Sequence, residues 1–173
     1  MRNWVRLAVL PMVAMGVISV AHAGSDTTSF QVKITITESC DIKSTAATDV
    51  DFLSHVRSSA SNSLDATGNL SVTCSKGTPY AIALDMGKNP VPGATSDVNR
   101  RMVLANNYVP YGLYRDAGRT QLWGNVAGAG GDTLTGTGSA AAQSIPVYGR
   151  VQAGAINVPA GTYVDTVQAT ISY

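Results

Sequence analysis

Short runs in which apolar and polar residues alternate constrain the fold of this chain more than any other feature of its sequence. In the clearest run, four apolar residues occupy every second position: Phe30, Val32, Ile34 and Ile36. Side chains on a β-strand point alternately to its two faces, so this run would have one apolar and one polar face. Helical periodicity is almost absent after residue 23, and the sequence therefore predicts an all-β fold.

Further strands are expected at five places along the chain: residues 70–74, 80–86, 108–115, 145–151 and 167–173. Pro110 cannot donate a backbone hydrogen bond, which places the third of these near a sheet edge. Residues 87–99 and 124–143 are rich in Gly, Pro and small polar residues and are expected to be loops. Six or seven strands in one domain favour a β-sandwich over a closed barrel.

The N-terminus has the pattern of a secretory signal peptide. Arg2 and Arg6 precede an apolar stretch at residues 7–20, which ends at Ala21-His22-Ala23. The alternative is a membrane anchor, but fourteen helical residues span only about 21 Å, short of the ~30 Å hydrocarbon core. We therefore expect residues 1–23 to be a signal peptide that is cleaved before Gly24.

Charge gives no indication of a nucleic-acid partner. The whole chain has 12 basic and 11 acidic residues, and loss of Arg2 and Arg6 with the signal peptide leaves 10 basic residues against 11 acidic ones. Such a balance offers no attraction for nucleic acid or an acidic membrane. No second apolar run reaches membrane-spanning length. The mature chain is expected to form one domain without a membrane span.

Cys40 and Cys74 are the two cysteines, and pairing is the default in an oxidising compartment. His55 is the only histidine after residue 23, so neither a metal site nor a Ser-His-Asp arrangement is expected. Residues 136–141 match the dinucleotide pattern G-x-G-x-x-A formally, but no useful strand precedes them. We therefore predict a structural disulfide, no cofactor and no enzyme.

Tyrosines spread along the chain leave a carbohydrate-binding surface as an alternative.

Several motifs occur in the order found in a known family: LSVTCSKGTPYAIAL at 70–84, YGLYRD at 111–116, WG at 123–124, VYGRV at 147–151 and GTYVDTV at 161–167. Together they resemble the spore coat protein U domain family over nearly all of residues 28–173. Within that family the chain is most similar to subunits of archaic (Csu-type) chaperone–usher pili. Leu53 departs from the pattern, because a glycine would be expected after Asp51-Phe52.

The resemblance implies an immunoglobulin-like β-sandwich that lacks its final strand. A periplasmic pilus chaperone would first fill the resulting groove, and at the outer-membrane usher the N-terminal strand of another subunit would replace it by donor-strand exchange. The expected donor side chains are those of the alternating run, namely Phe30, Val32, Ile34 and Ile36. The expected groove and chaperone-docking edge consists of Val167, Ala169, Ile171 and Tyr173. The alternative for residues 28–37 is an ordinary first strand of the subunit's own sandwich.

These expectations divide the chain into a signal peptide (1–23), a donor segment (24–37) and a pilin domain (38–173). The resemblance implies a structural subunit of an extracellular pilus that supports surface attachment and biofilm formation. Its partners would be the chaperone, the usher, and copies of itself or related pilins. The alternatives are a monomeric surface- or carbohydrate-binding module, and a spore-coat or envelope protein that forms no pilus.

Overall fold

The structure is a computed structural model that describes residues 24–43, 45–57, 61–95 and 99–173. The expected signal peptide at residues 1–23 lies outside the described residues. The chain divides into two units, Met1–Thr35 and Ile36–Tyr173. In the first unit, described residues 24–35 belong to no helix or strand, and their side chains are exposed.

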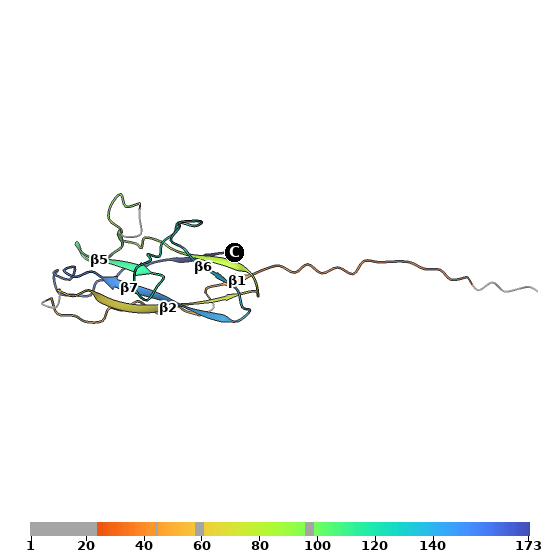
Figure 1. The fold of residues 1–173 in the computed structure, drawn as a ribbon, viewed down its shortest axis with the longest axis horizontal. Coiled ribbons are helices and arrows are strands. Elements are labelled where there is room, and N and C mark those ends of the chain that lie inside the picture. Colours follow the sequence, from red (N-terminus) through yellow and green to blue (C-terminus); the bar gives the residue numbers. More distant parts are fainter. Residues whose placement is uncertain (1–23, 44, 58–60, 96–98) are drawn as a thin grey trace, which may run out of the picture. The chain divides into compact units, whose positions relative to one another are not determined.

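The second unit contains the regular structure, and all of its described elements are strands (Figure 1). In chain order they are β1 (Cys40–Asp41), β2 (Leu64–Cys74), β3 (Pro79–Leu84), β4 (Arg101–Leu104), β5 (Asn107–Tyr114), β6 (Leu134–Thr137), β7 (Ala142–Val151) and β8 (Ala169–Ser172). No helix of the described residues is long and apolar enough to cross a membrane.

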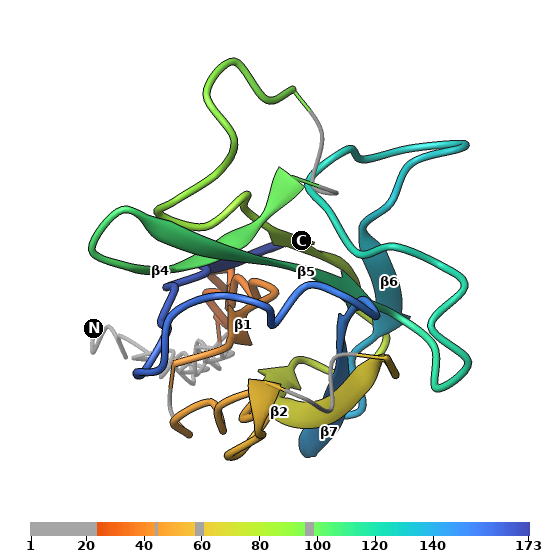
Figure 2. The same ribbon diagram turned by 90° about the vertical axis from the view of Figure 1, so that its left-hand side faces the viewer.

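The strands form two antiparallel sheets, which Figure 2 shows from one end. The larger sheet has the order β1-β2-β7-β5-β4, and the smaller one has the order β6-β3-β8. The ladder between β2 and β7 is the longest and runs from Leu64 opposite Val151 to Thr73 opposite Ala142. The expectation of an all-β, immunoglobulin-like sandwich is confirmed.

The core lies between the sheets because alternate residues of each strand face inward. On β2 the buried positions include Leu70 and Val72, and on β3 they include Tyr80, Ile82 and Leu84. Trp123 is fully buried and its indole Nε1 donates to the backbone oxygen of Ile82 at 2.8 Å. A buried tryptophan needs such a partner for its N–H group.

Arg100 is also fully buried, which is unusual for a charged side chain. Its guanidinium donates to the backbone oxygens of Leu84, Asp85 and Trp123 at 2.8–3.0 Å. These bonds join β3 to the segment after β5. The burial of the charge is tolerated because several of its N–H groups meet an acceptor.

Cys40 and Cys74 form the predicted disulfide, which joins β1 to the end of β2. Closing a loop of this length stabilises a fold by about 3–4 kcal/mol on the chain-entropy model. Beyond the disulfide, Thr48 pairs with Asn69 by two backbone hydrogen bonds of 2.9 and 3.3 Å. Cys40, Asp41 and Thr48 therefore pair along the edge of β2.

The structure corrects three details of the expected strands. Residues 124–143 are not entirely loop, because they contain β6 and the start of β7. β5 is not an edge strand, since it lies between β7 and β4; Pro110 faces Arg101 of β4 and lies outside the ladder with β7. The short strand β4 was not expected. The alternating run at residues 30–36 joins no ladder among the described residues.

Candidate strand-binding groove

An apolar cavity of about 1450 Å³ lies between the two sheets. We call it the groove. Its walls include Leu64 and Leu70 from β2, Val109 from β5 and Val151 from β7, together with Val167 just before β8. In a complete sandwich these inward-facing side chains would be covered by a neighbouring strand. The groove therefore leaves part of the core open.

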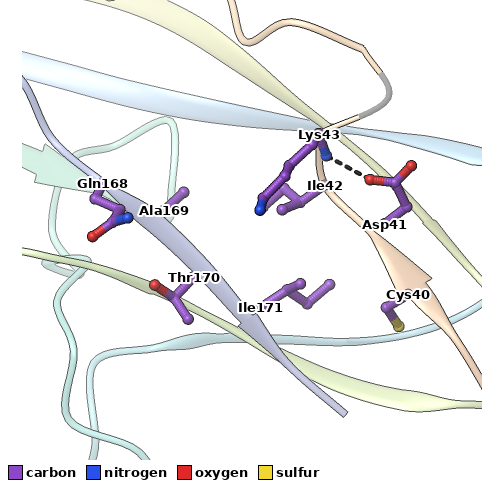
Figure 3. A pocket seen from close by; sticks show the side chains of 8 residues that line it. All are labelled: Cys40, Asp41, Ile42, Lys43, Gln168, Ala169, Thr170 and Ile171. Atoms are coloured by element: carbon purple, nitrogen blue, oxygen red, sulfur yellow. Dashed lines mark hydrogen bonds between the residues drawn. The ribbon is translucent and has the colours of Figure 1, made fainter.

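A second cavity of about 430 Å³ lies between residues 40–43 and residues 168–171. We call it the slot. Figure 3 shows the side chains of Ile42 and Ile171 in the space between β1 and β8. Ala169 lines both the slot and the groove, so the two cavities are neighbours.

β1 and β8 are the outer strands of their sheets on this side. In the described residues β1 pairs only with β2, and β8 pairs only with β3. The outer edge of a strand in such a position carries backbone donors and acceptors that a further strand can bind. The slot lies between the outer strands of the two sheets, and its lining is a mixture of apolar residues such as Ile42 and Ile171 with polar ones such as Lys43 and Thr170.

The opposite side of the sandwich is closed. Val103 of β4 and Val164 exchange two backbone hydrogen bonds of 2.9 and 3.2 Å. These bonds cover the edge of β4 with the chain that leads to β8. The edge of β4 at Val103 therefore offers no position for a further strand.

Asp165 holds the C-terminal segment in place beside the groove. Its carboxylate accepts hydrogen bonds from the Lys88 backbone N at 2.9 Å, the Asn89 side-chain amide at 3.0 Å and the Tyr111 hydroxyl at 2.7 Å. Burial, and then the hydrogen bond to this carboxylate, raise the pKa of Tyr111 far above its usual value. The hydroxyl therefore remains a donor at any physiological pH.

The structure places the predicted groove residues as follows. From residue 163 to residue 171 the side chains alternate between half-buried and exposed. Val167 and Ala169 line the groove, and Ala169 and Ile171 line the slot. Tyr173 lines neither cavity and is 61% exposed. Three of the four expected residues are thus brought together at one opening.

The four predicted donor side chains are among the most exposed apolar groups of the described residues. Their exposed fractions lie between 82 and 90% for Phe30, Val32, Ile34 and Ile36. A row of apolar side chains that meets only water is unfavourable, and a partner that covers it would remove that penalty.

Sequence reasoning did not find the wall of the slot opposite β8. Ile42 lies there because the disulfide and the ladder to β2 position the chain after Cys40. Phe52 was also missed as part of the inner face, where it packs against Gly149 of β7. A glycine inside an apolar strand was the available signal for such a close approach.

Leu53 lies next to Phe52 in a left-handed backbone conformation, with φ of 60°. Its backbone N donates to the Asp51 carboxylate at 2.7 Å. The glycine that the family pattern suggests at this position would adopt this conformation without strain.

Among the described residues no group of three or more His, Cys, Asp or Glu side chains could hold a metal ion.

Comparison with known proteins gives a family match and a structural match. The family model described as "Spore Coat Protein U domain" matches residues 26–170. "Protein U" of Myxococcus xanthus is 35% identical over 174 residues, which cover 96% of this chain and 95% of that protein.

Among solved structures, the fold is similar to the "CsuC-CsuE chaperone-tip adhesion subunit pre-assembly complex from archaic chaperone-usher Csu pili of Acinetobacter baumannii". The TM-score is 0.54 at 22% identity, and the match covers 80% of this chain. It covers 40% of the matched chain, so this chain corresponds to less than half of it. At this identity the likeness shows the fold alone.

Proposed function

Because the chain belongs to the Spore Coat Protein U domain family, we propose that it is a structural subunit of an archaic chaperone–usher pilus that polymerises by donor-strand exchange. The observation that carries the proposal is the combination of an open groove and slot with an exposed alternating run that joins no sheet. These features support an unfilled strand position and a strand-like segment that joins no sheet in the part of the chain that the structure describes.

In this proposal residues 28–37 of one copy lie between β1 and β8 of another copy. Backbone groups of the added strand bond to the outer edge of β8, and alternate side chains enter the groove. Burial of four large apolar side chains offers about 6–12 kcal/mol gross, an upper bound. Ordering of the segment offsets much of that gain. The remainder is what holds neighbouring subunits together.

Burial of the groove also explains why the subunit would need a periplasmic chaperone. Before assembly, the groove exposes apolar surface and the outer edge of β8 exposes backbone groups, which favour aggregation. A chaperone strand covers them until an outer-membrane usher exchanges it for the donor segment of the next subunit. The mature protein would then be exported through the periplasm and displayed as a surface pilus in attachment and biofilm formation.

Expression with and without the chaperone tests this function. Residues 24–173 alone in the periplasm are expected to aggregate, while co-expression with the cognate chaperone is expected to give a soluble one-to-one complex. Deletion of residues 24–37 should keep that complex and abolish polymers. Polymers that form without residues 24–37 would remove the donor assignment, and a stable lone monomer would favour a surface-binding module.

A second candidate is a coat or envelope protein that uses the same domain without forming a pilus. The description of the family and the 35% identity to Protein U over nearly its whole length favour it. Such a protein would bind no usher. Assembly that proceeds equally well in cells that lack the usher would support this candidate over the pilus.

A further inference from the structure

The chain at residues 165–169, which leads into β8, forms one wall of the groove. Val167 and Ala169 line the groove, and Gln168 lies between them (Figure 3 shows Gln168 and Ala169). Among the described residues β8 has a partner strand on one side only, which is β3. A four-residue strand with one partner frays readily, because few bonds hold it. While the groove is empty, this wall therefore depends on contacts outside the ladder.

Asp85 adds one further pair to the ladder between β3 and β8. The last pair of that ladder is Leu84 opposite Ala169, so Asp85 lies opposite Gln168. The Asp85 backbone N donates to the Gln168 backbone oxygen at 3.0 Å. In an ordinary antiparallel pair the return bond also joins the two backbones. Here the Gln168 backbone N donates instead to the carboxylate Oδ1 of Asp85, at 2.9 Å.

Arg100 explains why a side chain makes this return bond. Its guanidinium Nε donates to the Asp85 backbone oxygen at 2.8 Å, so that oxygen already serves a buried cation. The Asp85 carboxylate takes the place of the oxygen in the ladder. The same Oδ1 accepts from the Gly87 backbone N at 3.0 Å, which holds the carboxylate against its own turn. The position of the acceptor is therefore fixed by the fold and does not depend on Gln168.

Two carboxylates thus fix the wall of the groove, at residues 165 and 168. Asp165 belongs to the wall itself and accepts from the Lys88 backbone N and the Asn89 side-chain amide. Asp85 belongs to the end of β3 and binds the backbone of Gln168. Val167 lies between these two points and lines the groove. A strand that enters the groove would find this side chain already in place.

We propose that Asp85 is a positioning residue for the capture of a donor strand. Its carboxylate keeps Gln168, and with it Val167 and Ala169, in strand geometry before the donor arrives. The proposal rests on the proposed function, because it requires a strand to add to the outer edge of β8. Once that strand is bound, its own ladder holds β8 from the other side. Asp85 therefore governs how fast a strand is captured and not how long it stays.

Capture of a synthetic peptide tests this role. The mature chain, residues 24–173, is unfolded in urea with its disulfide intact and diluted into an excess of labelled peptide of residues 24–37. Trp123 is the only tryptophan after residue 23, so tryptophan fluorescence reports folding of the core. Anisotropy of the label reports capture, and a chase with unlabelled peptide reports release.

Three variants are compared with the unsubstituted chain. Asp85→Ala removes the acceptor, and Asp85→Asn keeps an acceptor oxygen at the same position. Asp65→Ala is the matched control, because Asp65 joins β2 to β7 through two hydrogen bonds from Arg150, at 2.7 and 2.8 Å, and lines neither the groove nor the slot.

The expected effect of Asp85→Ala is slower capture with an unchanged rate of release. Loss of one hydrogen bond shifts an equilibrium by roughly fivefold, and capture falls with the fraction of chains whose wall is ordered. The acceptor of two bonds is lost here, so capture should be slower by roughly fivefold or more. Asp85→Asn should restore most of the rate, and Asp65→Ala should capture the peptide as fast as the unsubstituted chain.

Equal capture rates for Asp85→Ala and Asp65→Ala would overturn the positioning role. Faster release from Asp85→Ala would overturn it too, because Asp85 would then support the filled sandwich. The same holds for a loss of the Trp123 signal in Asp85→Ala, since the core itself would then require Asp85, and for an Asp85→Asn chain that captures no faster than Asp85→Ala. Absence of capture by the unsubstituted chain would instead refute the proposed function.

Discussion

Truncation of one donor side chain should weaken the fibre without affecting the domain that carries it. Ile34 is 82% exposed in the isolated chain, so Ile34→Ala removes almost no contact from its own subunit. In the fibre, by contrast, the proposal buries this side chain in the groove of the neighbour. The substitution thus separates assembly from folding.

The size of the effect follows from the exposed fraction. Ile34→Ala removes three carbon groups, which are worth about 0.8 kcal/mol each on full burial, or about 2.4 kcal/mol together. Since the side chain is already 18% covered, as its 82% exposed fraction implies, about 2 kcal/mol remains to be lost. That corresponds to a roughly thirtyfold weaker association, expressed mainly in the dissociation rate.

The assay is the release of subunits from purified fibres in dilute denaturant, followed over time on non-boiled gels. Lys33→Ala is the matched control, because Lys33 lies on the polar face of the same run. We expect the Ile34→Ala fibre to dissociate about thirtyfold faster than the Lys33→Ala fibre. Equal rates would refute the burial of Ile34. A reduced yield of the chaperone complex would refute it too, since the side chain would then belong to its own core.

Three further predictions concern the groove and its support. Asp165→Asn should lower the stability of the fibre by about 1–3 kcal/mol in urea unfolding, because the Tyr111 hydroxyl loses a charged acceptor in a buried site; an unchanged urea midpoint would contradict this role. Because the folded state raises the pKa of Tyr111, its hydroxyl should stay protonated when ordinary tyrosines ionise near pH 10, and its stabilising contribution should be complete below that pH and decline above it. Ultraviolet titration should therefore show one tyrosine that ionises only on unfolding, and Tyr111→Phe should abolish that late step. Gly149→Ala should destabilise the domain by about 1–3 kcal/mol, because the added methyl group would overlap Val50 and the Phe52 ring; Gly24→Ala, with open space around it, should have no effect.

The alternation of apolar and polar residues was sufficient to predict those strands that have an apolar face of their own. Residues 70–74 and 80–84 alternate clearly, and both lie on strands, as their pattern predicts. The disulfide followed from the count of two cysteines and the expected compartment. The same reasoning placed Val167, just before β8, on one face with Ala169 and Ile171 of that strand, and these three residues line the groove or the slot.

The alternation of apolar and polar residues did not predict a strand that forms only because a neighbouring strand pairs with it. β6 consists of Leu-Thr-Gly-Thr in a small-residue tract, and it is a strand because β3 pairs with it. Gly136 has no side chain there, which leaves space for the Tyr80 ring. Such a pairing cannot be read from the four residues themselves.

The donor run shows that alternation alone does not make a strand. Its alternation is strong, but it pairs with no strand in the chain's described sheets. Alternation fixes which side chains share a face, and that property belongs to neighbouring residues. Whether the face is buried depends on what lies across from it.

The sequence by itself therefore determined the all-β class, the paired cysteines and the two-faced character of each strand, because these depend on residues close together in the chain or on composition. Only the tertiary structure decided that a cavity lies between residues 40–43 and β8 and that Ile42 and Ile171 both line it (Figure 3). These features join segments more than a hundred residues apart, and their contacts arise from packing of the whole sandwich.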